Sequence, residues 1–170
     1  MIYFVRHGQS TANAGGVTMA HAEIPLSELG RRQAALVATL LDVEPVLLLS
    51  STYLRAMETA RPFSEKLRGR NAALAQRHGP LRARHLVRTA GLIEGMVTAQ
   101  RRPMAEAFWL CWKLWGFTPT DATVMREFRR FQRALPMPNC AVYGLEQAAK
   151  GQWRLQANEA VMQKVAAAAA

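Results

Sequence analysis

The sequence predicts an α/β fold, a three-layer sandwich in which a mostly parallel central sheet is flanked by helices. Two largely apolar stretches of strand length, residues 2–6 and 46–49, each run into polar residues. Between them, residues 29–41 repeat apolar side chains at helical spacing. This strand-helix-strand order implies two parallel strands joined by a right-handed crossover.

The first predicted strand ends in Arg6, His7 and Gly8 and leads into a polar loop that carries Thr11 and Asn13. Open α/β sheets bind ligands at the carboxyl ends of their strands. Gly8 leaves room for the close approach of a ligand, and the polar loop supplies groups that can hold an anion. For this stretch alone, an ordinary strand that ends at a histidine is the alternative interpretation.

The helix predicted over residues 53–67 follows the second strand directly and carries Arg55 in its first turn. Pro62 is expected to kink or restart this helix, because proline lacks the backbone N–H that the helix needs. The ends of the two strands, one with Arg6 and His7 and the other with Arg55, are therefore expected to meet at the same anion.

The helix over residues 29–41 has Ser27 as its candidate N-cap. Further along the chain, residues 104–115 predict an aromatic core helix, and residues 123–134 predict a basic amphipathic helix. Residues 140–146 and 152–156 predict a hairpin that turns at Lys150 and Gly151. The basic helix is expected to bury Phe128 and Phe131 and to expose Arg126, Arg129, Arg130 and Arg133.

The composition is that of a globular protein, with 170 residues of which 50% are hydrophobic and 20% are charged. We expect one domain over residues 1–160, followed by an Ala-rich tail over 161–170. No signal peptide or membrane span is expected, because the apolar stretches are short or interrupted. Cys111 and Cys140 are the two cysteines and imply no disulfide framework, so a reducing cytoplasm is the expected location.

The formal net charge of +10 is concentrated in residues 61–102, where ten Lys or Arg residues face Glu65 and Glu94. Such a stretch can attract phosphorylated substrates or nucleic acid. A solvated arginine-rich surface is the simpler interpretation. The chain shows no zinc-ligand spacing, aromatic RNA-binding pattern or recognition helix, so nucleic acid is disfavoured as a partner.

Three ordered motifs lie in the first sixty residues, namely Arg6-His7-Gly8 with Thr11 and Asn13, residues 25–30, and Ser50-Ser51 with Arg55-Ala56 and Thr59-Ala60. On these motifs the chain resembles the histidine phosphatase superfamily, which has the phosphoglycerate mutase-like fold. A later stretch, residues 91–98, fits the family's Gly-x-x-Glu-Gly-x-x-Thr turn, and residues 138–142 look like its closing edge strand.

The resemblance implies an enzyme, a phosphoric monoester hydrolase that acts on a small phosphorylated substrate without a metal or another cofactor. His7 is the implied nucleophile and forms a phosphohistidine. Arg6 and Arg55 would bind the nonbridging oxygens with their forked donors, and these charges disfavour the protonated imidazole. Asn13, Thr11 and the Gly8 amide are the implied substrate-binding groups.

The chain departs from the family at the general acid, because Val87 stands where the family usually has a glutamate. Glu94 is the candidate replacement, although its equivalent in the family is more often structural. The chain also has no histidine after Gly95, where the family carries a second catalytic His-Gly. We interpret this as a deletion that removes one strand and one donor, and such a loss typically slows the reaction by about 10²- to 10³-fold.

Three other histidines offer weaker candidates. His78 and His85 can replace the second histidine, but a surface position is the simpler interpretation of each. His21 can line the mouth of the pocket or lie in an ordinary loop.

The sequence thus predicts a shortened and divergent histidine phosphatase with reduced activity. The alternative is a degenerate member that binds phosphate or a partner without turnover. The natural substrate and the oligomeric state stay open.

Overall fold

The structure is a computed structural model, and it describes residues 1–16, 20–41, 43, 45, 48, 50–78, 122–149 and 152–169. The chain divides into two compact units. The sheet unit consists of Met1–Arg6 and Arg102–Ala168, and the helical unit consists of His7–Arg101.

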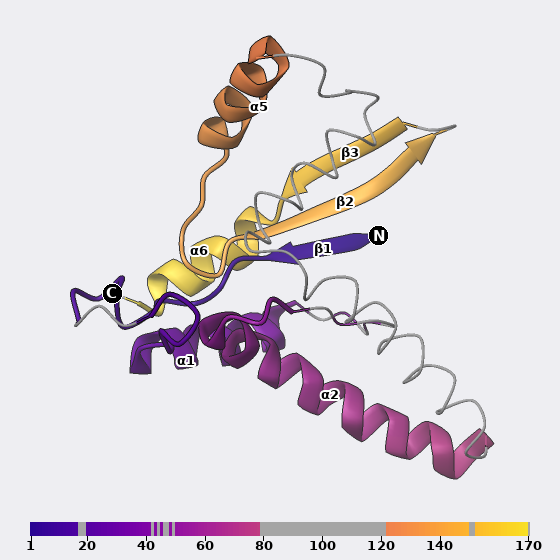
Figure 1. The fold of residues 1–170 in the computed structure, drawn as a ribbon. Coiled ribbons are helices and arrows are strands. Elements are labelled where there is room, and N and C mark those ends of the chain that lie inside the picture. The colour runs from indigo at the N-terminus through magenta and orange to yellow at the C-terminus, as the bar shows by residue number, and fades with distance from the viewer. Residues whose placement is uncertain are drawn as a thin grey trace. The chain divides into compact units, whose positions relative to one another are not determined.

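The sheet unit contains an antiparallel sheet in the order β1-β2-β3 (Figure 1). Its strands are β1 (Ile2–Val5), β2 (Val142–Ala149) and β3 (Gln152–Ala157). The pairing of β2 with β3 confirms the predicted hairpin, whose turn residues lie outside the described part of the chain. In the other pair, Val5 lies opposite Val142 and Ile2 lies opposite Leu145.

The three strands of this sheet run antiparallel, whereas the sequence predicted mostly parallel pairing. Of the second predicted strand, over residues 46–49, the structure describes only Leu48, so its parallel pairing with β1 stays a prediction. The expectation of an edge strand over residues 138–142 is wrong. The strand begins at Val142, and it bonds to β1 on one side and to β3 on the other.

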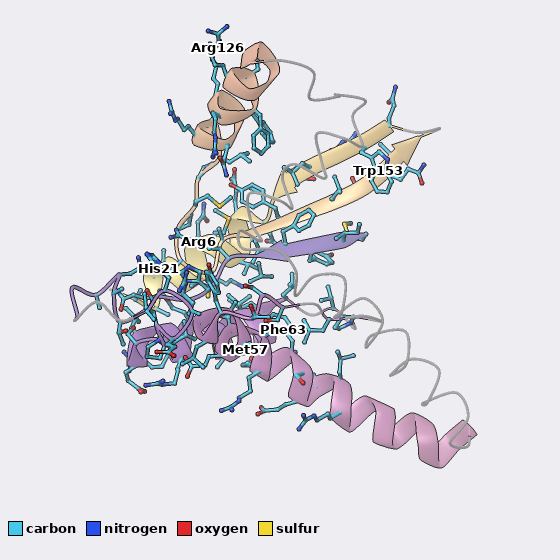
Figure 2. The ribbon with its side chains drawn as sticks, viewed as in Figure 1. Arg6, His21, Met57, Phe63, Arg126 and Trp153 are labelled. Carbon is cyan, nitrogen blue, oxygen red and sulfur yellow. The ribbon has the colours of Figure 1, made fainter. Side chains whose placement is uncertain are left out.

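The core of the sheet unit forms where α5 (Ala122–Ala134) packs its apolar side on β2. Phe128 and Tyr143 are buried, and Phe131 packs against them. The Tyr143 hydroxyl donates to the Pro136 carbonyl at 2.5 Å. As predicted, the arginines of α5 are exposed on its other side, where Figure 2 shows Arg126. They are Arg126, Arg129, Arg130 and Arg133.

The helix α6 (Glu159–Ala167) follows β3 and is capped by Asn158, whose side-chain oxygen accepts from the Val161 amide at 3.2 Å. Val161 and Val165 are buried, so one side of α6 belongs to the core. The predicted boundary between domain and tail falls inside this helix, and the one-domain organisation stays a prediction.

The helical unit begins with α1 (Glu28–Leu40), within one residue of the predicted helix at both ends. Ser27 is its N-cap, as predicted, and its hydroxyl accepts from the Gly30 amide at 3.0 Å. One side of the helix is buried, and this side consists of Gly30, Gln33, Ala34, Val37 and Ala38.

The second helix of this unit, α2 (Leu54–His78), is longer than predicted and runs through Pro62 without ending. A proline inside a helix costs about 3 kcal/mol or more, which is why a kink or a restart was expected. Phe63 is buried directly after it, and the ammonium group of Lys66 donates to the Ala38 carbonyl of α1. These contacts with the rest of the unit favour continuation of the helix past the proline.

Several predicted features lie outside the described residues, namely His85, Glu94, the turn over 91–98 and the helix over 104–115. Where the structure does describe helices, none has the length and apolar character needed to cross a membrane.

Candidate active site

The His7 imidazole is held by the carbonyl of the next residue. Its Nδ1 lies 2.8 Å from the Gly8 oxygen. A carbonyl oxygen only accepts hydrogen bonds, so Nδ1 must carry the hydrogen in this contact. In the neutral imidazole the lone pair is then on Nε2, which is the nitrogen able to attack an electrophile.

Gly8 is buried against α1, and this differs from the role that the sequence suggested. A Cβ at position 8 would lie 2.5 Å from the Gly30 carbonyl oxygen, so α1 fills the space that was expected for a ligand. The Gly8 amide donates to the Thr59 hydroxyl at 3.1 Å. Contact of this amide with phosphate stays a prediction. It requires that the amide give up its hydrogen bond to the Thr59 hydroxyl or share its hydrogen between the two acceptors.

The Gln9 backbone forms hydrogen bonds to α1 and its N-cap through both its amide and its carbonyl. Its amide donates to Gln33 Oε1 at 2.9 Å, and its carbonyl accepts from the Ser27 amide at 2.9 Å. The Ser27 hydroxyl also donates to Gln9 Oε1 at 2.7 Å. A Cβ at Gly30 would collide with the Gln9 carbonyl, so a glycine is needed for this close approach. These contacts hold the loop after His7 on the first turns of α1.

Asn13 closes the polar loop on itself. Its Oδ1 accepts from the Ser10 hydroxyl at 2.9 Å, and the Ser10 hydroxyl accepts from the Asn13 amide at 3.2 Å. Asn13 is exposed, and its Nδ2 has no hydrogen-bond acceptor among the described residues. Thr11 is half-buried, and its amide donates to the Pro25 carbonyl at 3.0 Å.

Arg55 lies in the first turn of α2, as predicted, and is held by the loop that precedes α1. Its Nη1 donates to the His21 carbonyl at 2.6 Å, and its guanidinium carbon lies 4.7 Å from the centre of the Tyr53 ring. The His21 contact uses one of the five N–H donors of the guanidinium. His21 acts here through its backbone, and its imidazole is exposed.

Thr59 connects the two predicted catalytic segments of the helical unit. Its hydroxyl accepts from the Gly8 amide and donates to the Arg55 carbonyl at 2.7 Å. Neither Thr59 nor Gln33 was among the predicted site residues. Thr59 belongs to one of the three motifs, so a signal for it was present, whereas the sequence offers no comparable signal for Gln33.

Arg6 belongs to the sheet unit and is half-buried there (Figure 2). Its Nη1 donates to the Met137 carbonyl, and its amide donates to the Ala141 carbonyl at 2.9 Å. Burial lowers the pKa of the Arg6 guanidinium, and the nearby Cys140 opposes this shift. Burial has the opposite effect on the Cys140 thiol and raises its pKa to about 12, while the positive charge of Arg6 lowers that pKa in part.

The structure therefore brings His7, Gly8 and Arg55 into one hydrogen-bonded assembly within the helical unit, beside the loop of Thr11 and Asn13. The other proposed catalytic residue with a known position, Arg6, is anchored in the sheet unit. Glu94 has no described position. No cluster of three or more His, Cys, Asp or Glu side chains that could hold a metal ion occurs within the part of the chain described here.

The chain belongs to the histidine phosphatase superfamily (branch 1), because the model of this family matches residues 2–134. This confirms the resemblance drawn from the motifs near the N-terminus. The α/β class is confirmed with it, and the parallel sheet and the three-layer arrangement stay predictions.

Among its relatives, the chain is similar to glucosyl-3-phosphoglycerate phosphatase of Mycobacterium tuberculosis, with 34% identity over 109 residues, 64% of this chain and 47% of the relative. It is also similar to phosphoglycerate mutase-like protein 4 of Arabidopsis thaliana, with 35% identity over 109 residues, 63% of this chain and 46% of the relative. The matches thus span about half the length of these curated relatives. The chain is also similar to a solved structure, that of the putative phosphohistidine phosphatase SixA from Agrobacterium tumefaciens. The match covers 90% of this chain and 92% of that chain, with 17% sequence identity and a TM-score of 0.46.

Proposed function

We propose that the protein is a phosphatase that hydrolyses a small phosphoester through a phosphohistidine on His7. The observation that carries the proposal is the contact of His7 Nδ1 with the Gly8 carbonyl, which leaves the lone pair on Nε2. Membership of the histidine phosphatase superfamily and the phosphatase names of curated relatives support it.

In the first step, His7 Nε2 attacks phosphorus, and the bond from phosphorus to the leaving oxygen breaks. The imidazole becomes positively charged as the new P–N bond forms. The Gly8 carbonyl stabilises this charge, because its hydrogen bond to Nδ1–H strengthens when the donor becomes cationic. The leaving oxygen takes a proton from an acid, for which Glu94 is the candidate.

In the second step, water attacks phosphorus and gives a proton to the acid that lost one in the first step. The P–N bond breaks, and phosphate and neutral His7 are released. Phosphoryl transfer depends mainly on positioning and on stabilisation of the charge on the nonbridging oxygens. Arg55 and Arg6 are the proposed cationic donors for these oxygens. Asn13, which is exposed, is proposed to add its side-chain amide as a donor, and Thr11 and Gly8 belong to the same proposed binding loop.

The second candidate function is binding of phosphate or a phosphorylated partner without turnover. The observations that favour it are in the sequence, which has Val87 at the usual position of the acid and no histidine beyond His85. A site of this kind keeps the anion-binding donors but lacks the groups that protonate and stabilise the leaving oxygen.

Hydrolysis of an aryl phosphate by the wild-type protein and by H7A, between pH 5 and 8, separates the two functions. An aryl leaving group needs little protonation, so the assay reports the nucleophile even without a general acid. Phosphatase function requires turnover by the wild type and its loss in H7A, with both proteins equally folded by circular dichroism. Turnover that persists in H7A contradicts the mechanism. No turnover in either protein, together with vanadate binding, favours the second function.

A further inference from the structure

A single hydroxyl group links the residue after the proposed nucleophile to the backbone of the proposed phosphate-binding arginine. Thr59 Oγ1 accepts from the Gly8 amide at 3.1 Å and donates to the Arg55 carbonyl at 2.7 Å. A hydroxyl has one donor hydrogen and two lone pairs, so it satisfies both partners at once. Thr59 is only 4% exposed, so water cannot easily replace these partners.

The link continues to the imidazole, because Gly8 is bonded through both its amide and its carbonyl. The amide is bound by Thr59, and the carbonyl is bound by His7 Nδ1 at 2.8 Å. A continuous chain of hydrogen bonds therefore runs from the His7 ring through Gly8 and Thr59 to the backbone of Arg55.

The opposite side of Gly8 leaves the loop little room to adjust. Gly8 packs on the Gly30 carbonyl, and the following amide of Gln9 is held by Gln33. Those contacts hold the loop on α1, and Thr59 holds it on α2, the helix that carries Arg55. The hydroxyl thus sets where the loop lies relative to the guanidinium-bearing helix.

We infer that Thr59 is a positioning residue for phosphoryl transfer, which orients the His7 imidazole relative to Arg55 through the Gly8 backbone. The inference rests on the proposed function of His7 and Arg55. Without the hydroxyl, the buried Gly8 amide loses its acceptor and the loop shifts to find another. A misplacement of about 1 Å away from the reacting atoms can reduce a rate about 10²-fold.

The test compares T59V, T59S and a matched control, T39V. Valine keeps the shape and the β-branching of threonine but removes the hydroxyl. Serine keeps the hydroxyl. The Thr39 hydroxyl on α1 likewise donates to the carbonyl one turn earlier, that of Ala35, at 3.1 Å. Thr39 is exposed and lies at the C-terminal end of α1, whereas the loop packs on the first turns of this helix.

With an aryl phosphate as substrate, we expect T59V to reduce kcat about 10- to 100-fold with a smaller change in KM. T59S should recover kcat to within a few-fold of the wild type, and T39V should not change it. Equal kcat values for T59V and T39V would overturn the inference. Failure of T59V to fold while T59S folds would also overturn it, because the hydroxyl would then serve stability.

A second measurement separates this inference from the proposed function. Nitrogen-15 NMR of the folded proteins reports the tautomer of His7 and the exchange of its Nδ1 proton without any substrate. We expect faster exchange in T59V than in T59S, and an unchanged His7 signal in T59V would overturn the positioning role. If wild type and H7A hydrolyse alike, the proposed function fails. If H7A is inactive and T59V matches wild type, only the inference fails.

Discussion

Gly8 and Gly30 lie where the loop after His7 meets α1, and neither position has room for a side chain. A Cβ on Gly8 would lie 2.5 Å from the Gly30 carbonyl oxygen, and a Cβ on Gly30 would collide with the Gln9 carbonyl. The loop that carries His7 can therefore lie directly on the first turn of α1. This contact, together with Thr59 and Gln33, gives the proposed nucleophile a rigid backbone support.

Replacement of Gly8 by alanine should destabilise the protein by overpacking. Inserting a methyl group into a tightly packed site costs about 1–3 kcal/mol, and here the obstacle is backbone, which cannot rotate away. The free energy of unfolding in urea measures the loss. Gly16→Ala is a useful comparison, because its Cβ would lie 2.9 Å from the Thr11 carbonyl on the exposed side of the loop. A smaller loss in G8A than in G16A would contradict this account.

Replacement of Gln33 by leucine should also reduce the free energy of unfolding. Gln33 is 6% exposed, and its Oε1 is the acceptor for the Gln9 amide. Leucine has a similar size but leaves that amide without an acceptor, which costs about 1–3 kcal/mol. An exposed glutamine on β3, Gln156, provides the control, and Q156L should change stability by about 0.5 kcal/mol or less. Denaturant unfolding should give a lower free energy of unfolding for Q33L than for Q156L. Equal free energies would contradict the hydrogen bond between the Gln9 amide and Gln33.

Replacement of Arg55 by lysine should weaken catalysis although it preserves the charge. Lysine lacks the planar fork that binds two oxygens of a phosphoryl group and cannot reproduce the stacking on Tyr53. We expect kcat/KM for an aryl phosphate to fall about 10²-fold. Arg32→Lys serves as control, because Arg32 is exposed on α1 and pairs with Glu28 at 3.8 Å. If kcat/KM falls by a similarly small factor in both variants, Arg55 does not bind the phosphoryl group as proposed.

Cys140 should make the protein less stable in alkali. Its pKa is raised from 9.0 to about 12 by burial, so between these values the unfolded thiol loses its proton while the folded thiol keeps it. The stability from this group is complete below pH 9 and decreases by about 1.4 kcal/mol per pH unit above it. Unfolding of wild type and C140A at pH 8 and pH 10 tests this, because the variant lacks the thiol. If wild type and C140A lose the same free energy of unfolding between pH 8 and pH 10, the pKa of Cys140 is not raised in the folded protein.

The local patterns of the sequence predicted several elements correctly. Ser27 caps α1, α5 buries Phe128 beneath an arginine face, and residues 140–156 contain a hairpin. Each of these depends on neighbours within a few residues, such as a capping hydroxyl, a helical repeat of apolar side chains or alternation along a strand. The position of Arg55 at the start of α2 followed from the same kind of local signal.

Local patterns were less reliable where a contact with a distant segment decided the outcome. Pro62 suggested a kink or a restart of α2, and the helix does not restart there. It continues through the proline, where Phe63 is buried and Lys66 donates to the Ala38 carbonyl. Residues 138–142 suggested an edge strand, yet β2 has strands on both sides because β1 and β3 pair with it. Neither helix packing nor strand order can be derived from the spacing of residues within one segment.

The sequence alone determined the family, the histidine and arginine motifs, the positions of α1 and α5 and the start of α2, because these are properties of short stretches of chain. Only the tertiary structure decided what holds the His7 loop. Gly8 bonds Thr59, 51 positions away, Gln9 bonds Gln33, 24 positions away, and Gly8 packs on Gly30. Such contacts form when the packing of buried surfaces brings separate segments together, and each buried amide then takes the acceptor that lies within reach.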